Sequence, residues 1–457
     1  MKKRFAICST IVLLLLLSAC GAPQTLDFSY APEGEELSSL MVETSQTHRA
    51  ELEHVPSAAD FADAISDDPA SAGLLSESEV ESLLRGHAAM ETVSKEQAQS
   101  DVSLLFRTLQ SAYGAYEYFG QEKFDAAEDA VTQWLSSQND EIKVSALGEK
   151  LQESLAFMLA HDAHAVIYEP AAEEIEAQVR YEYFFADGFY FSKDVNGSYY
   201  MVNDGERWTL SSFSDEHVSV QPTLLQDGRI VYQPTLFALR KDAVQSSVTL
   251  KNSSGKAKIY RLDWTESQPL DVDLGTLDYR LIQEDGLTYV SLRSFVSGTY
   301  DNMLARYARE GAKARGSKAV IYDLRGNVGG SDSWPRKWIQ SFLGTQNSIE
   351  TSMLYAQKNS ALFAAENSES LLPEDEGTCF AREVHGTWYE NDIPIIVLVD
   401  DHCGSSGEGA VQLLKTLDNV LIVGSNTAGY QLCGNISTFT LPYTGIGVRF
   451  GSTLFLY

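Results

Sequence analysis

The chain has 457 residues and carries 34 Lys and Arg against 64 Asp and Glu, which gives a formal net charge of −30 at pH 7. This length suggests roughly two or three domains, with ample chain for buried cores. The strong negative charge argues against nucleic acid as a partner, because a polyanion would be repelled over much of the surface. A solvated, extracytoplasmic surface fits the composition better.

The N-terminus predicts a lipoprotein signal peptide over residues 1–20. Three basic residues at positions 2–4 precede an uncharged run from 5 to 19 that is too short for a comfortable membrane span. The run ends in Leu-Ser-Ala before Cys20, the pattern that bacterial lipoprotein processing reads. We therefore expect Cys20 to be acylated and to anchor the protein on the extracytoplasmic face of the cell membrane. The alternative is an ordinary cleaved signal with an incidental cysteine.

The remaining cysteines leave a disulfide open. Cys8 leaves with the signal peptide, whereas Cys379, Cys403 and Cys433 stay in a compartment that permits disulfides. Cys403 and Cys433 flank the two segments assigned below to the active site, so they form either a bridge or two free buried thiols. The Cys and His residues show no metal-ligand spacing, and neither a metal nor another cofactor is expected.

Residues 21–95 are predicted to form a largely disordered acidic tether. Between 21 and 100 there are sixteen Asp or Glu against three Lys or Arg, and such a composition buries little surface. A weak helical pattern from 76 to 90 is the exception. Residues 96–165 predict a helical cap subdomain, with Ser145 expected to cap its third helix. Its apolar side chains recur at helical spacing on three stripes: Leu105, Leu109 and Tyr113; Phe124, Val131 and Trp134; Leu147, Leu151, Leu155 and Met158.

Residues 166–286 predict a β-rich domain, because aromatic and β-branched residues alternate with hairpin-forming dipeptides. These dipeptides are Asn196-Gly197, Asp204-Gly205 and Asp227-Gly228. From 287 to 457, apolar strands at 319–322, 393–399 and 420–423 alternate with helices expected near 334–342 and 408–417. Fully apolar strands covered by helices indicate an α/β layer domain, so the predicted fold class is α/β.

Two turns of this last domain carry the predicted chemistry. Residues 400–408, Asp-Asp-His-Cys-Gly-Ser-Ser-Gly-Glu, stand between a buried strand and a helix. Such a turn exposes a nucleophile at Ser405, and the free amides at the helix start favour an oxyanion nearby. The alternative is that Ser405 only caps the helix. Residues 323–330, Asp-Leu-Arg-Gly-Asn-Val-Gly-Gly, follow another strand, and their glycines let the backbone approach a ligand.

Four motifs in this order resemble the tail-specific, or C-terminal processing, serine peptidases of the S41 type, relatives of the tricorn core protease. They are Leu159–His164, Asp323–Gly330, Ser405–Glu408 and Val423–Gly429, of which the first is the most degenerate. The resemblance is strongest in the last third of the chain. It implies a ClpP/crotonase-like catalytic domain beside the helical cap and the β-rich insert, and a peptide or protein substrate.

The resemblance also implies roles for single residues. Ser405 stands three positions before the glutamate of its motif and would be the nucleophile, while the amides of Ser406 and Gly330 (or Gly329) would form the oxyanion hole. The best-known branch of the family uses a lysine as base, but Tyr430 occupies that position here. The chain instead resembles the tricorn-like branch, which lacks the Ser/Lys dyad and takes a histidine from the helical subdomain.

His164 matches that histidine and is predicted as general base, because a neutral imidazole can accept the Ser405 proton and return it to the leaving amine. His161 and His402 are competitors. The tricorn-like branch orients its histidine with a glutamate near the chain end, but no Glu follows Glu408 here, and Asp162 is the available substitute. The chain stops at position 457 inside a predicted strand, so we expect either a fragment with a truncated catalytic domain or a protein without the orienting residue.

These observations predict a lipid-anchored serine peptidase that hydrolyses peptide bonds through a Ser405 acyl-enzyme. The alternative is a catalytically impaired, peptidase-like lipoprotein that binds peptides or another ligand. It is motivated by Tyr430 in the lysine position, by the degenerate Leu159–His164 motif and by the missing glutamate. A hydrolase of esters or cell-wall crosslinks would differ from the peptidase only in its substrates.

Overall fold

The structure, a computed structural model, describes residues 37–65, 74–168, 181–186, 188–203, 205–225, 229–239, 246–266, 279–298, 301–367, 371 and 375–457. These residues form two compact units, one within 1–42 and 180–268 and the other within 43–179 and 269–457. The predicted signal peptide with Cys20 lies outside the described residues, as do Asp204 and the Asp227-Gly228 turn. No helix in the described ranges is both long and apolar enough to cross a membrane.

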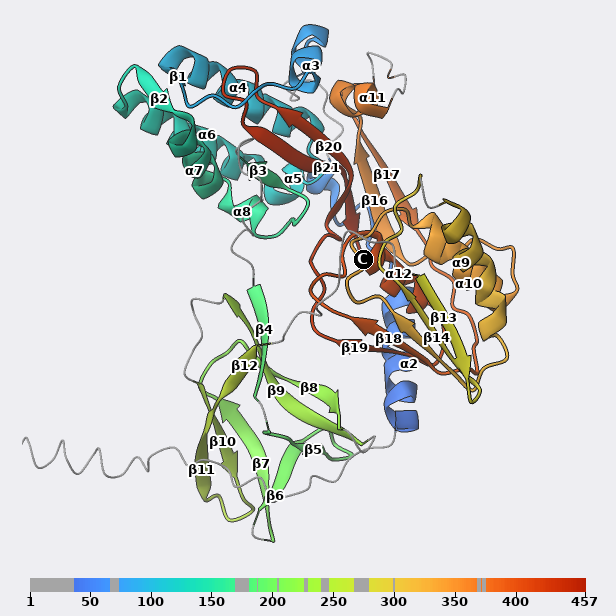
Figure 1. Cartoon of the computed structure of the whole chain (residues 1–457). Helices are drawn as coiled ribbons and strands as arrows, with labels where there is room; N and C mark the ends of the chain where they lie inside the picture. The colour runs from blue at the N-terminus through green and yellow to red at the C-terminus, as the bar shows by residue number, and fades with distance from the viewer. Residues whose placement is uncertain are drawn as a thin grey trace, which may run out of the picture. The chain divides into compact units, whose positions relative to one another are not determined.

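The unit within 180–268 consists of two antiparallel sheets (Figure 1), with strand orders β11-β10-β7-β6-β5 and β12-β4-β9-β8. Asn196-Gly197 forms the turn between β5 and β6, where Gly197 has φ 79°. The two sheets share one buried core that includes Phe191, Trp208 and Tyr232. The strands are β4 Tyr181–Ala186, β5 Ser192–Lys193, β6 Tyr199–Asn203, β7 Glu206–Phe213, β8 Val218–Leu224, β9 Ile230–Leu239, β10 Ser246–Lys251, β11 Ala257–Leu262 and β12 Trp264–Glu266.

The other unit begins with helices whose predicted apolar stripes face a common core. Of those side chains, Leu105, Leu109, Tyr113, Phe124, Val131, Leu147, Leu151, Leu155 and Met158 are buried together. Ser145 does not begin its helix, because α7 starts one residue earlier and has no side-chain cap. The helices are α3 Glu77–Leu84, α4 Lys95–Ala112, α5 Tyr116–Phe119, α6 Gln121–Ser137, α7 Val144–Ser154 and α8 Ala156–Leu159, and a short ladder pairs β1 Thr92–Ser94 with β2 Glu141–Lys143.

An antiparallel sheet with the order β17-β16-β21-β20 shares the core of these helices. Strand β3, which follows the turn that carries His164, adds to this sheet by pairing Ile167 with Val448 of β21. This pairing fixes the end of the helical segment to the C-terminal part of the chain. The strands are β3 Val166–Tyr168, β16 Met353–Lys358, β17 Cys379–Val384, β20 Cys433–Thr440 and β21 Gly447–Leu456, and helix α11 spans Ala361–Asn367.

A further sheet of the same unit has the order β13-β14-β15-β18-β19, and its pairings from β14 to β19 are parallel. The carboxyl ends of parallel strands meet at one edge of a sheet, so the turns after β15 and β18 lie close together. Helices α9, α10 and α12 pack on this sheet around a buried core, which confirms the predicted α/β class. The bounds are β13 Tyr279–Glu284, β14 Leu287–Leu292, α9 Asp301–Ala314, β15 Ala319–Asp323, α10 Ser333–Leu343, β18 Ile395–Val399, α12 Ser406–Leu414 and β19 Val420–Gly424.

Part of the stretch predicted as disordered is a packed helix. It is helix α2, Leu37–Glu53, whose residues from 43 onward are joined by polar groups to the rest of the unit that contains them. The Asn419 amide donates to Ser45 Oγ at 2.9 Å, and Ser352 Oγ donates to the Leu52 carbonyl. Composition did not predict this helix, because hydroxyl and backbone groups, which leave no hydrophobic pattern in the sequence, make these contacts.

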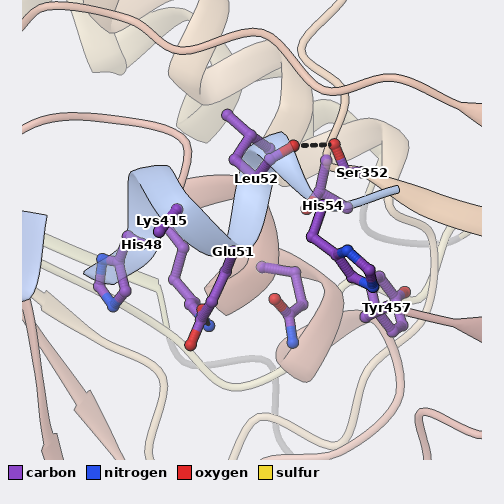
Figure 2. Close-up of a pocket in the computed structure, with 10 residues that line it drawn as sticks. His48, Glu51, Leu52, His54, Ser352, Lys415 and Tyr457 are labelled. Atoms are coloured by element: carbon purple, nitrogen blue, oxygen red, sulfur yellow. Dashed lines mark hydrogen bonds and ion pairs between the residues drawn. The ribbon is translucent and has the colours of Figure 1, made fainter. Parts of the chain in front are cut away.

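Helix α2 also borders a cavity of about 550 Å³ (Figure 2). Figure 2 shows Lys415 beside Glu51, with which it forms an ion pair, and His54 beside Tyr457. His48 also lines the cavity, and burial and the charge of Lys415 lower its pKa to about 4. None of the residues predicted for the active site lines this cavity.

Candidate functional site

Ser405 occupies a strained turn between β18 and α12. Its backbone has φ 53° and ψ −122°, a conformation that costs a non-glycine residue on the order of 1–3 kcal/mol. Neighbouring backbone holds the turn in place: the Gly404 amide donates to the Asn327 carbonyl, and the Gly409 amide donates to the Ser405 carbonyl, both at 2.9 Å. Strain maintained in this way is typical of functional turns. Ser405 is at the same time the N-cap residue of α12.

The glycine-rich turn after β15 is anchored by a buried carboxylate. Burial alone would raise the pKa of Asp323, but hydrogen bonds from Arg325, Arg293 and Tyr289 outweigh it and hold the pKa at about 2. The turn meets the Ser405 turn closely, because a Cβ placed on Gly329 would lie 2.6 Å from Ser405 Cβ. Gly329 also has φ 95°, so glycine is required there on both counts.

Two backbone amides beside Ser405 are available to an incoming group. The Gly329 amide donates to Asn327 Oδ1 at 2.9 Å and is therefore occupied. The amides of Gly330 and Ser406, by contrast, have no hydrogen-bond partner among the described residues. Ser406 Oγ donates to the Gly330 carbonyl at 2.8 Å, which links the two turns. Of the two glycines that the sequence offered for the oxyanion hole, the structure favours Gly330.

Glu408 ties the Ser405 turn to the loop before β20, a role that the sequence analysis missed. Its Oε2 accepts the amides of Ser405 at 3.0 Å and Tyr430 at 2.8 Å. Its Oε1 accepts Thr427 Oγ1 at 2.6 Å and the Gly429 amide at 2.8 Å. Burial raises the pKa of this carboxyl, but all four partners donate to it and so favour the carboxylate.

Replacing Glu408 by glutamine is expected to lower the free energy of unfolding by about 2–4 kcal/mol. The amide NH2 would face two N–H donors in place of an acceptor, which leaves buried donors without partners. Urea unfolding followed by circular dichroism measures the loss. Glu153→Gln is the matched control, because the Glu153 side chain is exposed and forms its ion pair with Lys150 across one helical turn. Equal stability of the two variants would contradict the account.

His164 follows α8 and is buried, with 8% of its surface exposed. Its Nδ1 lies 2.6 Å from the Cys433 carbonyl. A carbonyl only accepts, so Nδ1 carries the proton and Nε2 is left as the basic nitrogen. Burial lowers the pKa of His164 to about 4, assisted by the charge of Arg449, so the ring is neutral at neutral pH.

The group that orients the imidazole is therefore the Cys433 carbonyl and not Asp162. Asp162 Oδ1 accepts the His164 backbone amide at 3.0 Å, and Oδ2 accepts the Tyr113 hydroxyl at 3.0 Å. This buried carboxyl holds the backbone of the His164 turn rather than its ring. A backbone carbonyl has no sequence signature, so residue types alone could not identify the orienting group.

The Tyr430 ring contacts both the His164 ring and the turn that carries Ser405. The rings of His164 and Tyr430 have centroids 4.6 Å apart in a T-shaped contact. A Cβ on Gly404 would lie 2.7 Å from Tyr430 Cδ2, so the same ring also packs on the residue before Ser405. No hydrogen bond joins His164 to Ser405 among the described residues. The structure thus places the predicted base and the residue before the predicted nucleophile at one aromatic ring.

The competing histidines have other contacts. His161 is exposed, and its ring lies 6.4 Å from that of Phe119. His402 Nδ1 lies 3.0 Å from Asp401 Oδ1. Together with Asp400, these two residues form a group that could hold a metal ion. Each residue offers one ligand atom, and the three atoms lie within 4.8 Å of one another.

The structure shows no disulfide between the cysteines left open by the sequence. Cys403 and Cys433 are buried and unbridged, and Cys379 is partly buried. Burial raises the pKa of both Cys403 and Cys433, so neither is a reactive thiolate. The nucleophile suggested by the turn is therefore the serine and not the cysteine two residues before it.

A family model of known proteins matches the part of the chain that contains these two turns. Residues 286–451, which contain both turns, match the model of peptidase family S41. Mature CPAF complexed with lactacystin is similar at 13% identity over 79% of this chain and 90% of that chain, with a TM-score of 0.39. The photosystem II D1 C-terminal processing protease is similar at 14% identity over 78% and 88%, with a TM-score of 0.34. At these scores neither likeness carries an argument.

No curated protein matches the chain. The family match covers β14, β15, β18 and β19, together with the glycine-rich turn, Ser405 and Glu408. The part of this chain from 286 to 451 is thus similar to the peptidases of family S41.

Proposed function

We propose that this chain is a serine peptidase in which Ser405 is the nucleophile and His164 the general base. The observation that carries the proposal is the strained Ser405 turn beside the Gly330 and Ser406 amides, which have no partner within the described ranges. The family match supports a peptide or protein as the substrate.

In the proposed reaction, Ser405 Oγ attacks the scissile carbonyl carbon while its proton passes to His164 Nε2. The Cys433 carbonyl accepts a hydrogen bond from Nδ1–H throughout, so it keeps the required tautomer and stabilises the imidazolium. His164 then protonates the leaving amine, which departs and leaves an ester on Ser405. Water attacks this ester with His164 again as base, and the acid product leaves as Ser405 regains its proton.

The amides of Gly330 and Ser406 would receive the negative charge that develops on the carbonyl oxygen. Loss of one such donor typically raises the barrier by about 3 kcal/mol. The link from Ser406 Oγ to the Gly330 carbonyl fixes the two donors relative to each other before the substrate arrives. The helix start at Ser406 adds a favourable dipole at the same place.

We also propose a cellular location for the protein and an architecture for the rest of the chain. We place the protein on the extracytoplasmic face of the cell membrane with a lipid anchor at Cys20, on the strength of the residues 1–20 pattern. We also propose a ClpP/crotonase-like catalytic domain with a helical cap, and tricorn-like Ser-His chemistry, on the strength of the four motifs. Globomycin-sensitive processing and labelling with a radioactive fatty acid test the anchor.

The alternative, a peptide-binding protein without turnover, draws on the Tyr430 ring that contacts His164. A mixture of unstructured peptides distinguishes the two functions. We expect mass spectrometry to find new peptide termini after incubation with the chain, and none with its Ser405→Ala variant. Binding of intact peptides with no new termini would favour the alternative.

The pH dependence of hydrolysis follows from the state of His164. The base form is lost as the pH falls through the pKa of about 4, so kcat/KM should remain high at pH 6 and fall only near pH 4. An ordinary solvated histidine would lose activity near pH 6.5. The measurement is kcat/KM between about pH 3 and pH 8. An acid limb centred near 6.5 would contradict the buried environment of His164.

A further inference from the structure

We propose that Tyr430 is a positioning residue whose ring fixes the His164 imidazole against the Ser405 turn. This inference rests on the proposed function and deepens it, because Tyr430 occupies the position that the family resemblance assigns to a lysine base. The role assigned to it is mechanical: the ring sets the orientation and separation of base and nucleophile, and it takes no proton from Ser405.

On the His164 side, Tyr430 supplies a constraint that the hydrogen bond at Nδ1 does not supply. The bond to the Cys433 carbonyl fixes one point of the imidazole but allows the ring to rotate about that contact. The T-shaped contact with Tyr430, with an interplanar angle of 61°, opposes this rotation. Together the two contacts determine where Nε2 points.

On the Ser405 side, both the ring and the backbone of Tyr430 are attached to the turn. The ring packs on Gly404, where a Cβ would lie 2.7 Å from Cδ2. The Tyr430 amide shares Glu408 Oε2 with the Ser405 amide. Next along the chain, Gln431 Oε1 accepts Gln412 Nε2 of α12 at 3.0 Å. The loop that carries the ring is therefore fixed to the helix that starts at the nucleophile.

These contacts predict which part of the side chain matters. The contacts with His164 and Gly404 are made by the ring, so phenylalanine should retain them and alanine should not. Loss of the ring would let the imidazole swing while substrate binding stays largely intact. The expected effect therefore falls on kcat and not on KM.

The kinetic test compares Tyr430→Phe with Tyr430→Ala on a peptide that the chain cleaves. We expect the phenylalanine variant to stay within about threefold of the parent, and the alanine variant to lose at least about tenfold in kcat with KM changed less than about threefold. Tyr443→Ala is the matched control, because the Tyr443 side chain is exposed. It should behave like the parent.

A second readout does not depend on turnover. NMR titration of the His164 ring should give a pKa near 4 in the parent and in Tyr430→Phe. In Tyr430→Ala water reaches the ring, so the pKa should move towards 6.5. The other titratable or charged groups near this ring, Asp162, Cys433 and Arg449, are unchanged among these variants. If Tyr430→Ala does not fold, Tyr430→Leu fills the space without a ring and replaces it in both tests.

A double-mutant cycle tests the contact with Gly404. Gly404→Ala should be several-fold more harmful to kcat in the parent than in the Tyr430→Ala background, where the added methyl has room. The inference is overturned if Tyr430→Ala keeps both the parent kcat and the parent His164 pKa. If the parent itself neither cleaves peptides nor labels with a fluorophosphonate, the proposed function fails, whereas the NMR titration still decides whether Tyr430 holds the imidazole.

Discussion

Replacing Ser405 by alanine is expected to lower kcat/KM for peptide hydrolysis by at least about a thousandfold. The methyl group cannot form the acyl-enzyme, so only the weak catalysis supplied by bound substrate and the two amides would remain. The fold should survive, because the Ser405 amide still donates to Glu408 and the Ser405 carbonyl still accepts the Gly409 amide when the hydroxyl is removed. Initial rates on a fluorogenic peptide, with circular dichroism as the check on folding, measure the effect.

Ser406→Ala is the matched control for this prediction. Ser406 is proposed to act through its amide, which alanine retains, and the substitution removes only the hydrogen bond from Oγ to the Gly330 carbonyl. We expect a loss of less than about tenfold, in line with one hydrogen bond of about 1 kcal/mol. If Ser406→Ala abolished activity and Ser405→Ala did not, the nucleophile would be Ser406 and the assignment of the two serines would be wrong.

The His164→Ala variant is expected to lose about as much activity as Ser405→Ala, because the serine hydroxyl is a poor nucleophile without its base. The rate constant for labelling by a fluorophosphonate should fall in parallel, since that reaction also needs the proton to leave Oγ. Combining both substitutions should add little, because residues that act as a unit are not additive.

His161→Ala controls for the histidine chemistry, because that residue is three positions away and exposed. It should retain the parent rate within about threefold, as expected for a surface substitution. A His164→Ala variant that labels as fast as the parent, or a His161→Ala variant that does not label, would remove His164 from the mechanism.

Burial of neutral histidines also makes stability depend on pH. His48 and His164 both have pKa values lowered to about 4 in the folded chain, against about 6.5 when solvated. Between these values the unfolded chain binds protons that the folded chain does not, so stability is highest above pH 6.5 and falls as the pH drops towards 4. The loss of folding stability therefore begins at a higher pH than the loss of catalysis.

Hydrophobic periodicity was sufficient to predict the helices and strands that pack against an apolar core. The stripes through Leu105, Val131 and Leu151 predicted helices, which share one core, and the apolar runs before Asp323 and Asp400 predicted strands of an α/β domain, which lie next to each other in one sheet. The parallel arrangement then brings the two polar turns together. Helix α2 escaped prediction because it is held by groups such as Ser45 Oγ and the Leu52 carbonyl, which leave no periodic pattern.

The hydrogen-bond partners within the candidate site could not be predicted from the sequence. The strand-to-helix turn and the family resemblance predicted Ser405, and the resemblance alone predicted His164; their catalytic roles remain predictions. The Cys433 carbonyl and the four donors to Glu408 come from segments far apart in sequence, so they become partners only after the chain folds. The choice of Gly330 over Gly329 likewise depends on the Asn327 side chain, which occupies the Gly329 amide.

The most direct test of the central claim is to locate a covalent adduct on the protein. After reaction with a fluorophosphonate at neutral pH, digestion and tandem mass spectrometry should find the phosphonyl group on Ser405 in close to one equivalent. Prior incubation with a cleaved peptide should slow its appearance. An unmodified Ser405 in a folded chain, or an adduct that forms only at another residue, would contradict the account.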